Sequence, residues 1–408
     1  MAGVLERTLL RLVARPDARA GRVAVVAPPD GEVGRSARAV VAGLDRIGFA
    51  TPIDLLWPVE PRHLADLRAW RLGVVHLANE PERFADALRL AWSVPGLIAL
   101  HELDLGRVIG RLQVEGDAVA IAAAREAAWA EDRRGTGAAA TVAGIARRSR
   151  GIVVACEQDR AALEGLGCRT PIVVAPPPAE DPRTIRSARR RAARLRARAT
   201  ARGAGTLIVA TPGEPRWERA LVAARAGLGP GAEVVVLGDD AASTGPGVRV
   251  AARDPAERLG WLAAADIVVH LGEPREARSL VGAMQLGRPI VARARGAAAD
   301  VDRGALVLVE RSSELGAALA GLIADPGRAA ALGRAAAAEA ERSSRQERAA
   351  RAWARAIAAT AALVHDPTAH PMRRWAAALL DLGVDEGALA RGWGLSYVRA
   401  LRELRGQG

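Results

Sequence analysis

The stretch VVHLGEPREARSLVGAMQLGRPIVARARG, residues 268–296, decides the expected fold. It begins at Val268 with a short β-branched run, which is typical of a buried strand. Ala277 to Leu286 carries apolar residues at helical spacing, and Gly287 follows at the position that ends a helix. A second extended run starts at Pro289. This order of strand, loop, helix and strand predicts one unit of a doubly wound parallel sheet.

In such a sheet the loop and the helix N-terminus lie at the carboxyl edge of the strands, where anionic ligands bind. The loop from Leu271 to Ser279 is therefore the leading candidate for a phosphate or nucleotide site. Strand-like and helix-like segments alternate from Arg22 to Ala175, and the alternation resumes at Leu207. Repeated alternation of this kind predicts an α/β fold with parallel sheets.

A proline run at 176–178 and a dense Arg-rich helix interrupt that alternation, so we expect two Rossmann-like domains followed by C-terminal helices. Two such domains leave a cleft between their carboxyl edges. The expected units are a helical extension over 1–20, a first domain over 21–180, an Arg-rich linker helix over 181–204, a second domain over 205–340, and a C-terminal helical segment over 341–408 that packs back on the first domain.

The composition is that of a globular chain, with 50% hydrophobic and 25% charged residues. The formal net charge is +12 and every one of the basic residues is Arg, a bias that a GC-rich genome explains in part. The charge still favours an anionic partner, such as a sugar nucleotide or an acidic lipid surface. The Arg run over 183–202 fits a solvated helix better than a nucleic-acid surface, because it lacks the interleaved aromatic residues of single-strand binders.

Two cysteines, Cys156 and Cys168, argue against a disulfide framework or a cysteine-based zinc site. No apolar run reaches the length of about 18 residues that a spanning helix needs. The segment from Met1 to Arg15 has one apolar helical face but no secretory signal. We therefore expect a cytoplasmic protein, and contact with the inner face of the membrane stays open.

Three blocks in the first half point to a known family. They are VVAPPDGEVGRSARAVVAGL (25–44), VVHLANEPERFADALRLAWSVPGLIALHELDLGR (74–107) and the segment 151–178. With the second half, they resemble the GT-B glycosyltransferases, in particular the bacterial family 4 (group 1) enzymes that retain anomeric configuration, over roughly residues 20 to 360. The resemblance implies that Gly34 is the loop glycine beside acceptor and phosphate. It also implies that His101 and Glu102 stand for the family's His-Asp pair, with His101 catalytic. A structural role for His101 is the competing interpretation.

In the second half, ATPGEPRWERAL (210–221) aligns without a gap with the family's Gly-Arg-x-x-x-x-Lys-Gly loop. Gly213 matches, Glu214 falls where the family has its diphosphate-binding Arg, and Arg219 falls where it has its Lys. The resemblance implies that Gly213, Arg216 and Arg219 bind the donor diphosphate, and that Arg219 stabilises it as it leaves.

Residues 268–296 fall on the family's Glu-x7-Glu region. The first Glu position is Pro274 and the second is Gly282, so the donor motifs are degenerate. The donor residues that the resemblance implies here are Glu273, Glu276, Ser279 and Leu280, together with Gly238 at the end of an earlier strand. Glu273 and Glu276 are equally compatible with acids that stabilise a helix N-terminus.

The expected function is the transfer of a sugar from a nucleoside diphosphate sugar to an acceptor hydroxyl, with retention and without metal or cofactor. The acceptor, whether lipid, polysaccharide or small metabolite, and the oligomeric state stay open. One alternative is a catalytically weakened GT-B homologue that serves as a partner or scaffold, motivated by Glu214, Pro274 and Gly282. The third candidate is a basic nucleic-acid-binding protein.

Overall fold

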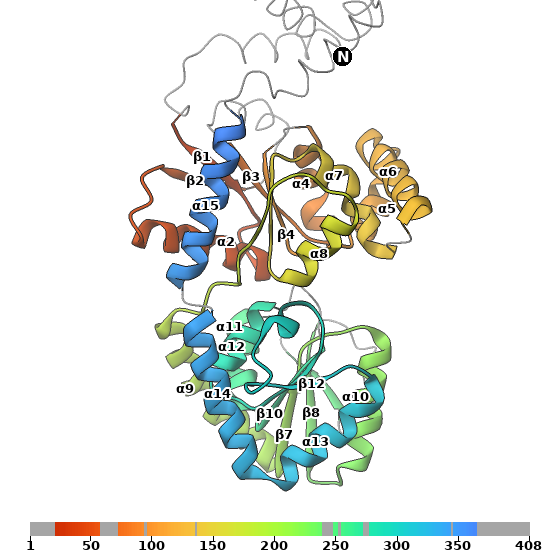
Figure 1. The fold of residues 1–408 in the computed structure, drawn as a ribbon. Helices are drawn as coiled ribbons and strands as arrows, with labels where there is room; N and C mark the ends of the chain where they lie inside the picture. The colour runs from red at the N-terminus through yellow and green to blue at the C-terminus, as the bar shows by residue number, and fades with distance from the viewer. Residues whose placement is uncertain are drawn as a thin grey trace, which may run out of the picture.

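The computed structural model describes residues 21–57, 72–93, 96–134, 137–238, 248–251, 254–271, 277–343 and 346–364. These residues form two α/β domains, one above the other in Figure 1, each built around a six-stranded parallel sheet. The expected fold class, α/β with two Rossmann-like domains, is confirmed. The expected extension over 1–20 and the chain after residue 364 lie outside the described residues.

The first sheet has the strand order β2-β1-β3-β4-β5-β6, and every pair in it is parallel. The order reverses between β1 and β3, and such reversals are where doubly wound sheets open a crevice for ligands. The strands are β1 (Val23–Val26), β2 (Ile53–Leu56), β3 (Leu72–Leu77), β4 (Leu97–Leu100), β5 (Gly151–Val154) and β6 (Ile172–Val174).

The second sheet has the order β12-β11-β10-β7-β8-β9, again all parallel. Counted from β7, this is the strand order of the dinucleotide-binding Rossmann fold, with the reversal between β7 and β10. The strands are β7 (Thr206–Ala210), β8 (Ala232–Leu237), β9 (Val248–Ala251), β10 (Ile267–His270), β11 (Ile290–Arg293) and β12 (Val307–Val309).

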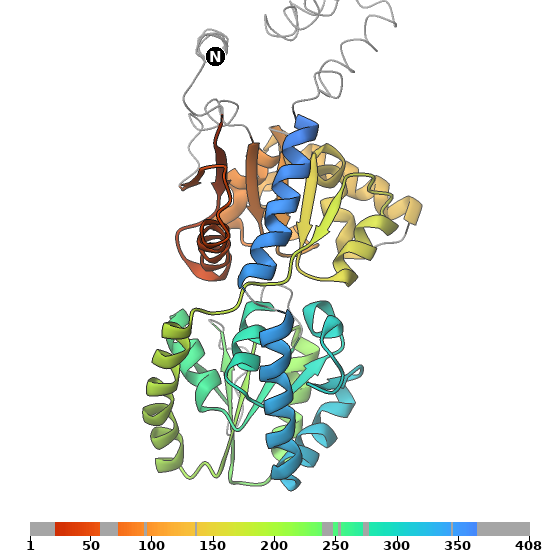
Figure 2. The ribbon, with the colours of Figure 1, turned by 60° about the vertical axis from the view of Figure 1, so that its left-hand side comes forward.

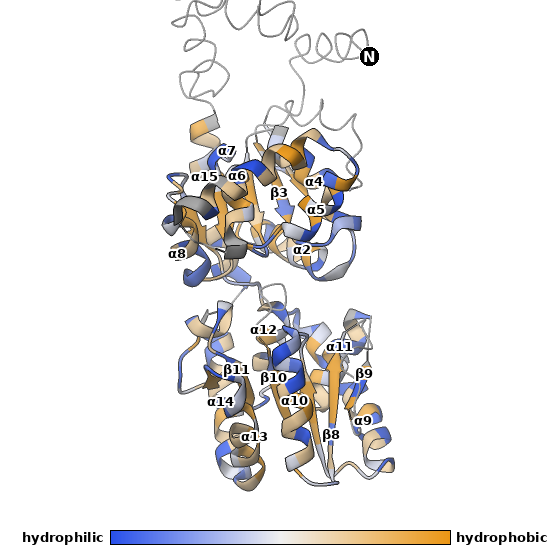
Figure 3. Ribbon diagram, turned by 90° about the vertical axis from the view of Figure 1, so that its right-hand side faces the viewer, coloured by the Kyte–Doolittle hydropathy of each residue, from blue (hydrophilic) through white to orange (hydrophobic). Residues whose placement is uncertain are grey.

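Helices cover both faces of each sheet (Figures 1 and 2), so the strands are apolar in both directions. In β1, Val23 and Val25 face one core while Ala24 and Val26 face the other, because successive strand residues point to opposite sides. Figure 3 shows that β8 is largely hydrophobic; Glu233 near its start is the exception. Buried apolar runs of this kind are why the sequence already predicted parallel sheets.

The helices of the first domain are α2 (Gly31–Arg46), α4 (Pro81–Ser93), α5 (Gly106–Val114), α6 (Ala118–Arg134), η1 (Gly137–Val142), α7 (Ala143–Arg148) and α8 (Glu157–Gly165). Those that follow are α9 (Pro182–Ala201), α10 (Pro215–Gly227), α11 (Pro255–Ala264), α12 (Ala277–Gln285), η4 (Gly296–Asp300), η5 (Ser312–Glu314), α13 (Leu315–Ala324), α14 (Pro326–Ser343) and α15 (Gln346–Val364). None of the helices in the described ranges is long and apolar enough to cross a membrane.

The Arg-rich helix α9 belongs to the second domain. Asp181 caps its first turn by accepting a 2.7 Å hydrogen bond from the Arg183 amide. One stripe of the helix, at Ile185, Ala188, Leu195 and Ala199, is buried in the core under the second sheet. The arginines occupy the other faces, so α9 is an amphipathic helix with a solvated charged side.

Helix α15 returns to the first domain and packs on the sheet face that α2 also covers. Figure 2 shows it crossing the first sheet above α14. Glycine permits this close approach: a Cβ at Gly43 would lie 3.1 Å from the Ala350 Cβ, and one at Gly151 would overlap the Thr360 hydroxyl. The first core is therefore completed by a segment distant in sequence.

Candidate functional site

The carboxyl edges of the two sheets face the junction between the domains. Residues that directly follow β4 and β5 line the same small cavity as Ala277 and Arg278, the first two residues of α12. This cavity has a volume of about 40 Å³ and is also lined by Glu32 and Ser36 of α2. Of the residues expected to act at strand ends, His101 lines this cavity.

His101 lies at this edge in contact with a second histidine. Its Nε2 is 2.9 Å from Nδ1 of His76 in β3, and the two rings stack with centroids 5.2 Å apart. His76 in turn stacks on Trp353 of α15, with centroids 5.4 Å apart. His76 is buried, as expected for a packing residue. Nδ1 of His101 has no hydrogen-bond partner among the described residues and is the ring nitrogen left for a ligand.

Burial determines the charge of this pair. It lowers the pKa of His101 to about 4, and burial followed by the neighbouring His101 lowers the pKa of His76 well below 6.5. Both rings are therefore neutral at pH 7, and one donates to the other. A neutral His101 offers a single hydrogen bond, as donor or acceptor, rather than a positive charge.

Glu102 stabilises the local backbone. Its Oε1 accepts a 3.0 Å hydrogen bond from the Asn79 amide, in the turn after β3. Asn79 Oδ1 accepts hydrogen bonds from the Arg107 and Val108 amides, at 2.9 and 3.2 Å, at the start of α5. Glu102 thus takes part in the hydrogen bonds that join the turn after β3 to the start of α5.

Gly34 was expected in a loop, and this was wrong, because α2 begins three residues earlier at Gly31. Gly34 lies inside the helix and is buried against the end of β1. A Cβ there would overlap the Pro28 carbonyl oxygen. Its requirement for glycine is close packing of helix against strand end, and the cavity-facing residues of this helix are instead Glu32 and Ser36.

Arg278 enters the same cavity from the second domain. Its Nε and one terminal nitrogen each lie 2.7 Å from a carboxylate oxygen of Glu180, in the segment between β6 and α9. Burial acts to lower the pKa of Arg278, but the hydrogen bonds and charge of Glu180 outweigh it and raise that pKa. Arg278 is 7% exposed and stays charged, and its second terminal nitrogen, Nη1, has no hydrogen-bond partner among the described residues.

At the reversal point of the second sheet, the ends of β7 and β10 pack closely. Thr211 Oγ1 accepts from the Leu271 amide at 3.2 Å and lies 3.2 Å from His270 Nδ1. A Cβ on Gly213 would overlap the Leu271 side chain. Gly213 is therefore required by the approach of these two strand ends, and its amide donates to Glu218 at 3.2 Å.

Glu214 lies at the start of α10 among three arginines. It accepts from Arg293 at 2.7 Å and from Arg295 at 3.1 Å, both at the end of β11, and pairs with Arg216 at 3.0 Å. Burial acts to raise the pKa of Glu214, but the Arg293 hydrogen bond and the neighbouring positive charges lower it below its usual value. Arg293 also lies over the Trp217 ring, 5.2 Å from its centroid. Three guanidinium groups around one carboxylate leave a net charge of about +2 at this edge.

Arg216 and Arg219 lie one turn apart on α10 and share a helix face. Both side chains are exposed, and Arg219 makes no ion pair with any described residue. Gly238, at the end of β8, is close only to Pro212, which lies 3.8 Å from the position that a Cβ would take. The structure brings Arg216 and Arg219 to the same edge as Glu214, and places no steric demand on Gly238.

The expected residues on α12 are buried. Ser279 is buried within the helix, and Leu280 belongs to the core beneath the second sheet. Gly282 is buried too, and a Cβ there would lie 2.9 Å from Leu259, so the glutamate of the family motif does not fit without rearrangement. Glu273, Pro274 and Glu276 lie outside the described residues.

Asp300 and Asp302 form an Asp-x-Asp sequence that our sequence reasoning overlooked. Asp300 accepts from the Glu157 amide at 2.8 Å, and Asp302 accepts from the Gly304 amide at 2.8 Å. Neither belongs to a group of three potential metal ligands in the described residues, which contain no such group. Both aspartates act here on backbone amides.

The functional candidates missed from the sequence are Arg278, Arg293 and Arg295. All three lie within residues 268–296, where the sequence prediction rested on the two glutamate positions of the family motif. The available signal was position: Arg293 ends a strand at the carboxyl edge, and Arg278 lies in the first turn of a helix at that edge.

No protein-family model matches the chain, and no curated protein matches its sequence. Solved structures do match. HepE from Anabaena, solved with UDP and glucose, superposes with a TM-score of 0.56 at 15% identity, over 83% of this chain and 99% of that one. Sucrose-phosphate synthase from Thermosynechococcus elongatus gives 0.58 at 16% identity, over 82% and 97%.

A third match is the UDP-forming α,α-trehalose-phosphate synthase from Burkholderia vietnamiensis, with a TM-score of 0.53 at 11% identity over 84% of this chain and 99% of that one. At such low identity these likenesses concern the fold. They extend over nearly the full length of each solved chain and include both domains. With its two facing parallel sheets, this chain therefore has the GT-B fold.

Proposed function

We propose that this chain transfers a sugar from a nucleoside diphosphate sugar to an acceptor hydroxyl, with retention of anomeric configuration. The observation that carries the proposal is the cluster of Arg216, Arg293 and Arg295 around Glu214 at the reversal point of the second sheet. Doubly wound sheets bind nucleotides at this position. The fold supports the same conclusion, since HepE was solved with UDP-glucose at this architecture.

In this proposal the donor diphosphate lies against the exposed arginines of that edge. Arg219 and Arg295 are exposed and can turn toward it, while Arg293 is held by Trp217 and Glu214. When the bond between the anomeric carbon and the diphosphate oxygen breaks, negative charge develops on that oxygen. Arg293, which is already held in place, stabilises this charge without reorganising.

The first domain supplies the hydroxyl-facing side. Neutral His101 presents Nδ1 to the cavity and can make one hydrogen bond to a hydroxyl of the donor sugar or the acceptor. Its stack with His76 and Trp353 fixes the ring plane. Closure of the two domains over the donor would exclude water and so limit hydrolysis.

The test is a binding and transfer assay with UDP, GDP, ADP and TDP and their common sugar conjugates. A ligand at a hundred times its dissociation constant stabilises the folded state by about 2.7 kcal/mol, a readily measured thermal shift. Arg219→Ala and Arg295→Ala should each reduce that shift and slow transfer. Both side chains are exposed, so the variants should fold.

The matched control is Arg190→Ala, which removes an exposed arginine on α9, far in sequence from the cluster. It should leave binding unchanged, since a loss of binding in all three variants would indicate only a general charge effect. If no nucleotide shifts the melting temperature of the wild-type chain, the proposal fails. The weakened homologue that acts as a partner or scaffold would then be the better account.

A further inference from the structure

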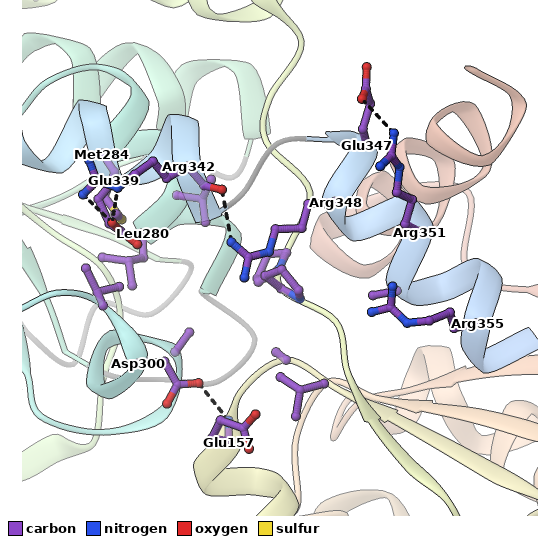
Figure 4. A pocket seen from close by; sticks show the side chains of 18 residues that line it. Glu157, Leu280, Met284, Asp300, Glu339, Arg342, Glu347, Arg348, Arg351 and Arg355 are labelled. Atoms are coloured by element: carbon purple, nitrogen blue, oxygen red, sulfur yellow. Dashed lines mark hydrogen bonds and ion pairs between the residues drawn. The ribbon is translucent and has the colours of Figure 1, made fainter. Parts of the chain in front are cut away.

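A second and larger cleft lies beside the two segments in which the chain passes from one domain to the other. It has a volume of about 740 Å³ and is drawn in Figure 4. It is lined by α8, η4 and α12, by the end of α14 and by the start of α15. We call it the hinge cleft. Its size is within the range of about 300–1,000 Å³ that small-molecule sites occupy.

The hinge cleft is separate from the arginine cluster around Glu214, since none of those residues lines it. Pro176 and Pro177, in the segment that joins the domains, line both it and the small cavity at His101. The two spaces are therefore neighbours along this proline segment. A ligand in the hinge cleft would leave the proposed donor site open.

Four arginines line the hinge cleft: Arg342 at the end of α14, and Arg348, Arg351 and Arg355 on α15. The three on α15 are spaced by three and four residues, which puts them on one face of the helix. Figure 4 shows them along one side of the cleft. The spacing from Arg348 to Arg355 corresponds to about 10 Å along the helix axis.

The carboxylates of the cleft are already engaged. Glu339 pairs with Arg342 at 2.7 Å and Glu347 with Arg351 at 3.7 Å. Glu157 pairs with Arg160 at 2.6 Å. The fourth, Asp300, accepts from the Glu157 amide at 2.8 Å.

Two guanidinium groups remain without a carboxylate partner among the described residues. Arg348 donates only to the Arg342 carbonyl oxygen, at 3.3 Å, and Arg355 makes no ion pair. They are the positions at which an anion from solution would be bound with least competition.

The floor of the hinge cleft is partly apolar. Leu280, Val281 and Met284 of α12 line it but are each at most 4% exposed, so the accessible apolar surface comes mainly from half-buried residues such as Val301 and Pro177. A phosphate group alone would use the arginines and leave this surface uncovered. A ligand with an apolar body and an anionic head would use both.

We propose that the hinge cleft binds an organic phosphate, with its phosphate on Arg348 and Arg355 and its apolar part against Val301 and Pro177. Because η4 and α12 belong to the second domain while α8 and α15 belong to the first, such a ligand contacts both domains. It binds one relative orientation of the domains more tightly than others, and so shifts the population toward that orientation. The site does not depend on the sugar-transfer proposal.

The experiment is isothermal titration calorimetry of the full chain with phenyl phosphate. Inorganic phosphate and phenol are titrated in parallel, and the dissociation constants of the three are compared. Phenyl phosphate should bind more tightly than either of the other two, because only it uses both the arginines and the apolar floor. The double variant Arg348→Ala/Arg355→Ala should bind phenyl phosphate with an affinity lower by about tenfold or more, since it removes two charge-assisted contacts.

Arg334→Ala is the matched control, because it removes an exposed arginine of α14 that does not line the cleft. Its affinity for phenyl phosphate should equal that of the wild type. The charge-reversal variant Arg348→Glu/Arg355→Glu should abolish binding while it keeps the thermal shift caused by nucleotide. Equal binding by wild type and double variant would overturn the proposal. Loss of phenyl phosphate binding in Arg295→Ala would overturn it as well, by assigning the anion to the other site.

Discussion

Glu214 and Arg293 form a 2.7 Å hydrogen bond between the start of α10 and the end of β11, across the end of β10. A carboxylate therefore occupies the centre of the positive cluster at the reversal point of the second sheet. It is held where the proposed diphosphate would also be attracted. The bond has opposite effects on the site: it orients Arg293, and it neutralises part of the charge that a phosphate needs.

Replacing Glu214 by Gln should tighten the binding of a nucleoside diphosphate. The change removes one negative charge but keeps the side-chain shape and a hydrogen-bond acceptor for Arg293. Through water, one unit of charge at about 4 Å is worth about 1 kcal/mol, so the affinity should rise about fivefold. Calorimetry with UDP or whichever nucleotide binds measures this. Weaker binding by the variant would mean that Glu214 serves mainly to position Arg293.

The neutral histidine pair makes stability depend on pH. His101 has a pKa of about 4 in the folded chain, against a usual 6.5, so the unfolded chain binds more protons between these values. The free energy of unfolding should therefore fall as the pH decreases from 6.5 toward 4, by up to about 3 kcal/mol from His101. His76 adds to the loss in the same direction.

Urea unfolding at pH 7, 6 and 5 measures this slope. His101→Gln should make it shallower, because one of the two protons taken up on unfolding is removed. The comparison stays above pH 5, where the carboxylates contribute least. Parallel slopes for the variant and the wild type would contradict the assignment.

Helix α15 packs so closely on the first sheet that Gly151 and Thr360 should show a steric interaction when Gly151 is replaced. Gly151→Ala should destabilise the fold by about 1–3 kcal/mol, because the new methyl group overlaps the Thr360 hydroxyl. Adding Thr360→Ala should restore much of the loss, since the Cβ of residue 360 lies 3.3 Å away. The control is Gly110→Ala in α5, where no atom lies within 4 Å. It should be neutral or stabilising. If the double variant is as unstable as Gly151→Ala alone, Thr360 of α15 does not lie against Gly151.

The Glu180–Arg278 pair predicts strong coupling between the inter-domain segment and α12. Glu180→Ala should cost about 3–5 kcal/mol because it leaves the buried Arg278 without its carboxylate. The double variant Glu180→Ala/Arg278→Ala should lose less than the sum of the two single variants. A thermodynamic cycle from chemical denaturation gives this coupling. Additive losses would show that the two side chains act independently.

The sequence predicted the two parallel sheets because their strands are short, β-branched and buried on both faces. Val23 to Val26 and Ile267 to Val269 are recognisable without any tertiary information. Gly34 was expected in a loop, because Gly31 and Gly34 resemble one in sequence, but α2 already begins at Gly31. Only the packed structure shows that Gly34 is needed inside a helix.

The candidate site was less predictable, since its contacts join residues distant in sequence. Glu214 and Arg293 are separated by 79 positions, and the stack of His76, His101 and Trp353 joins three segments. The local sequence showed only that Glu214 stands where the family has its diphosphate-binding Arg. It did not reveal that two arginines from β11 supply positive charge at the same place.

The return of α15 to the first sheet has a consequence for synthesis of the chain. Ribosomes make the strands of the first domain before any residue of the second, yet Ala350, Trp353 and Ile357 complete the core on one face of that sheet. Until they emerge, part of this apolar sheet face, the part that α2 does not cover, is exposed. The second domain is translated entirely within this interval, so it can fold while the first remains incomplete. The first domain then closes last, although its strands were made first.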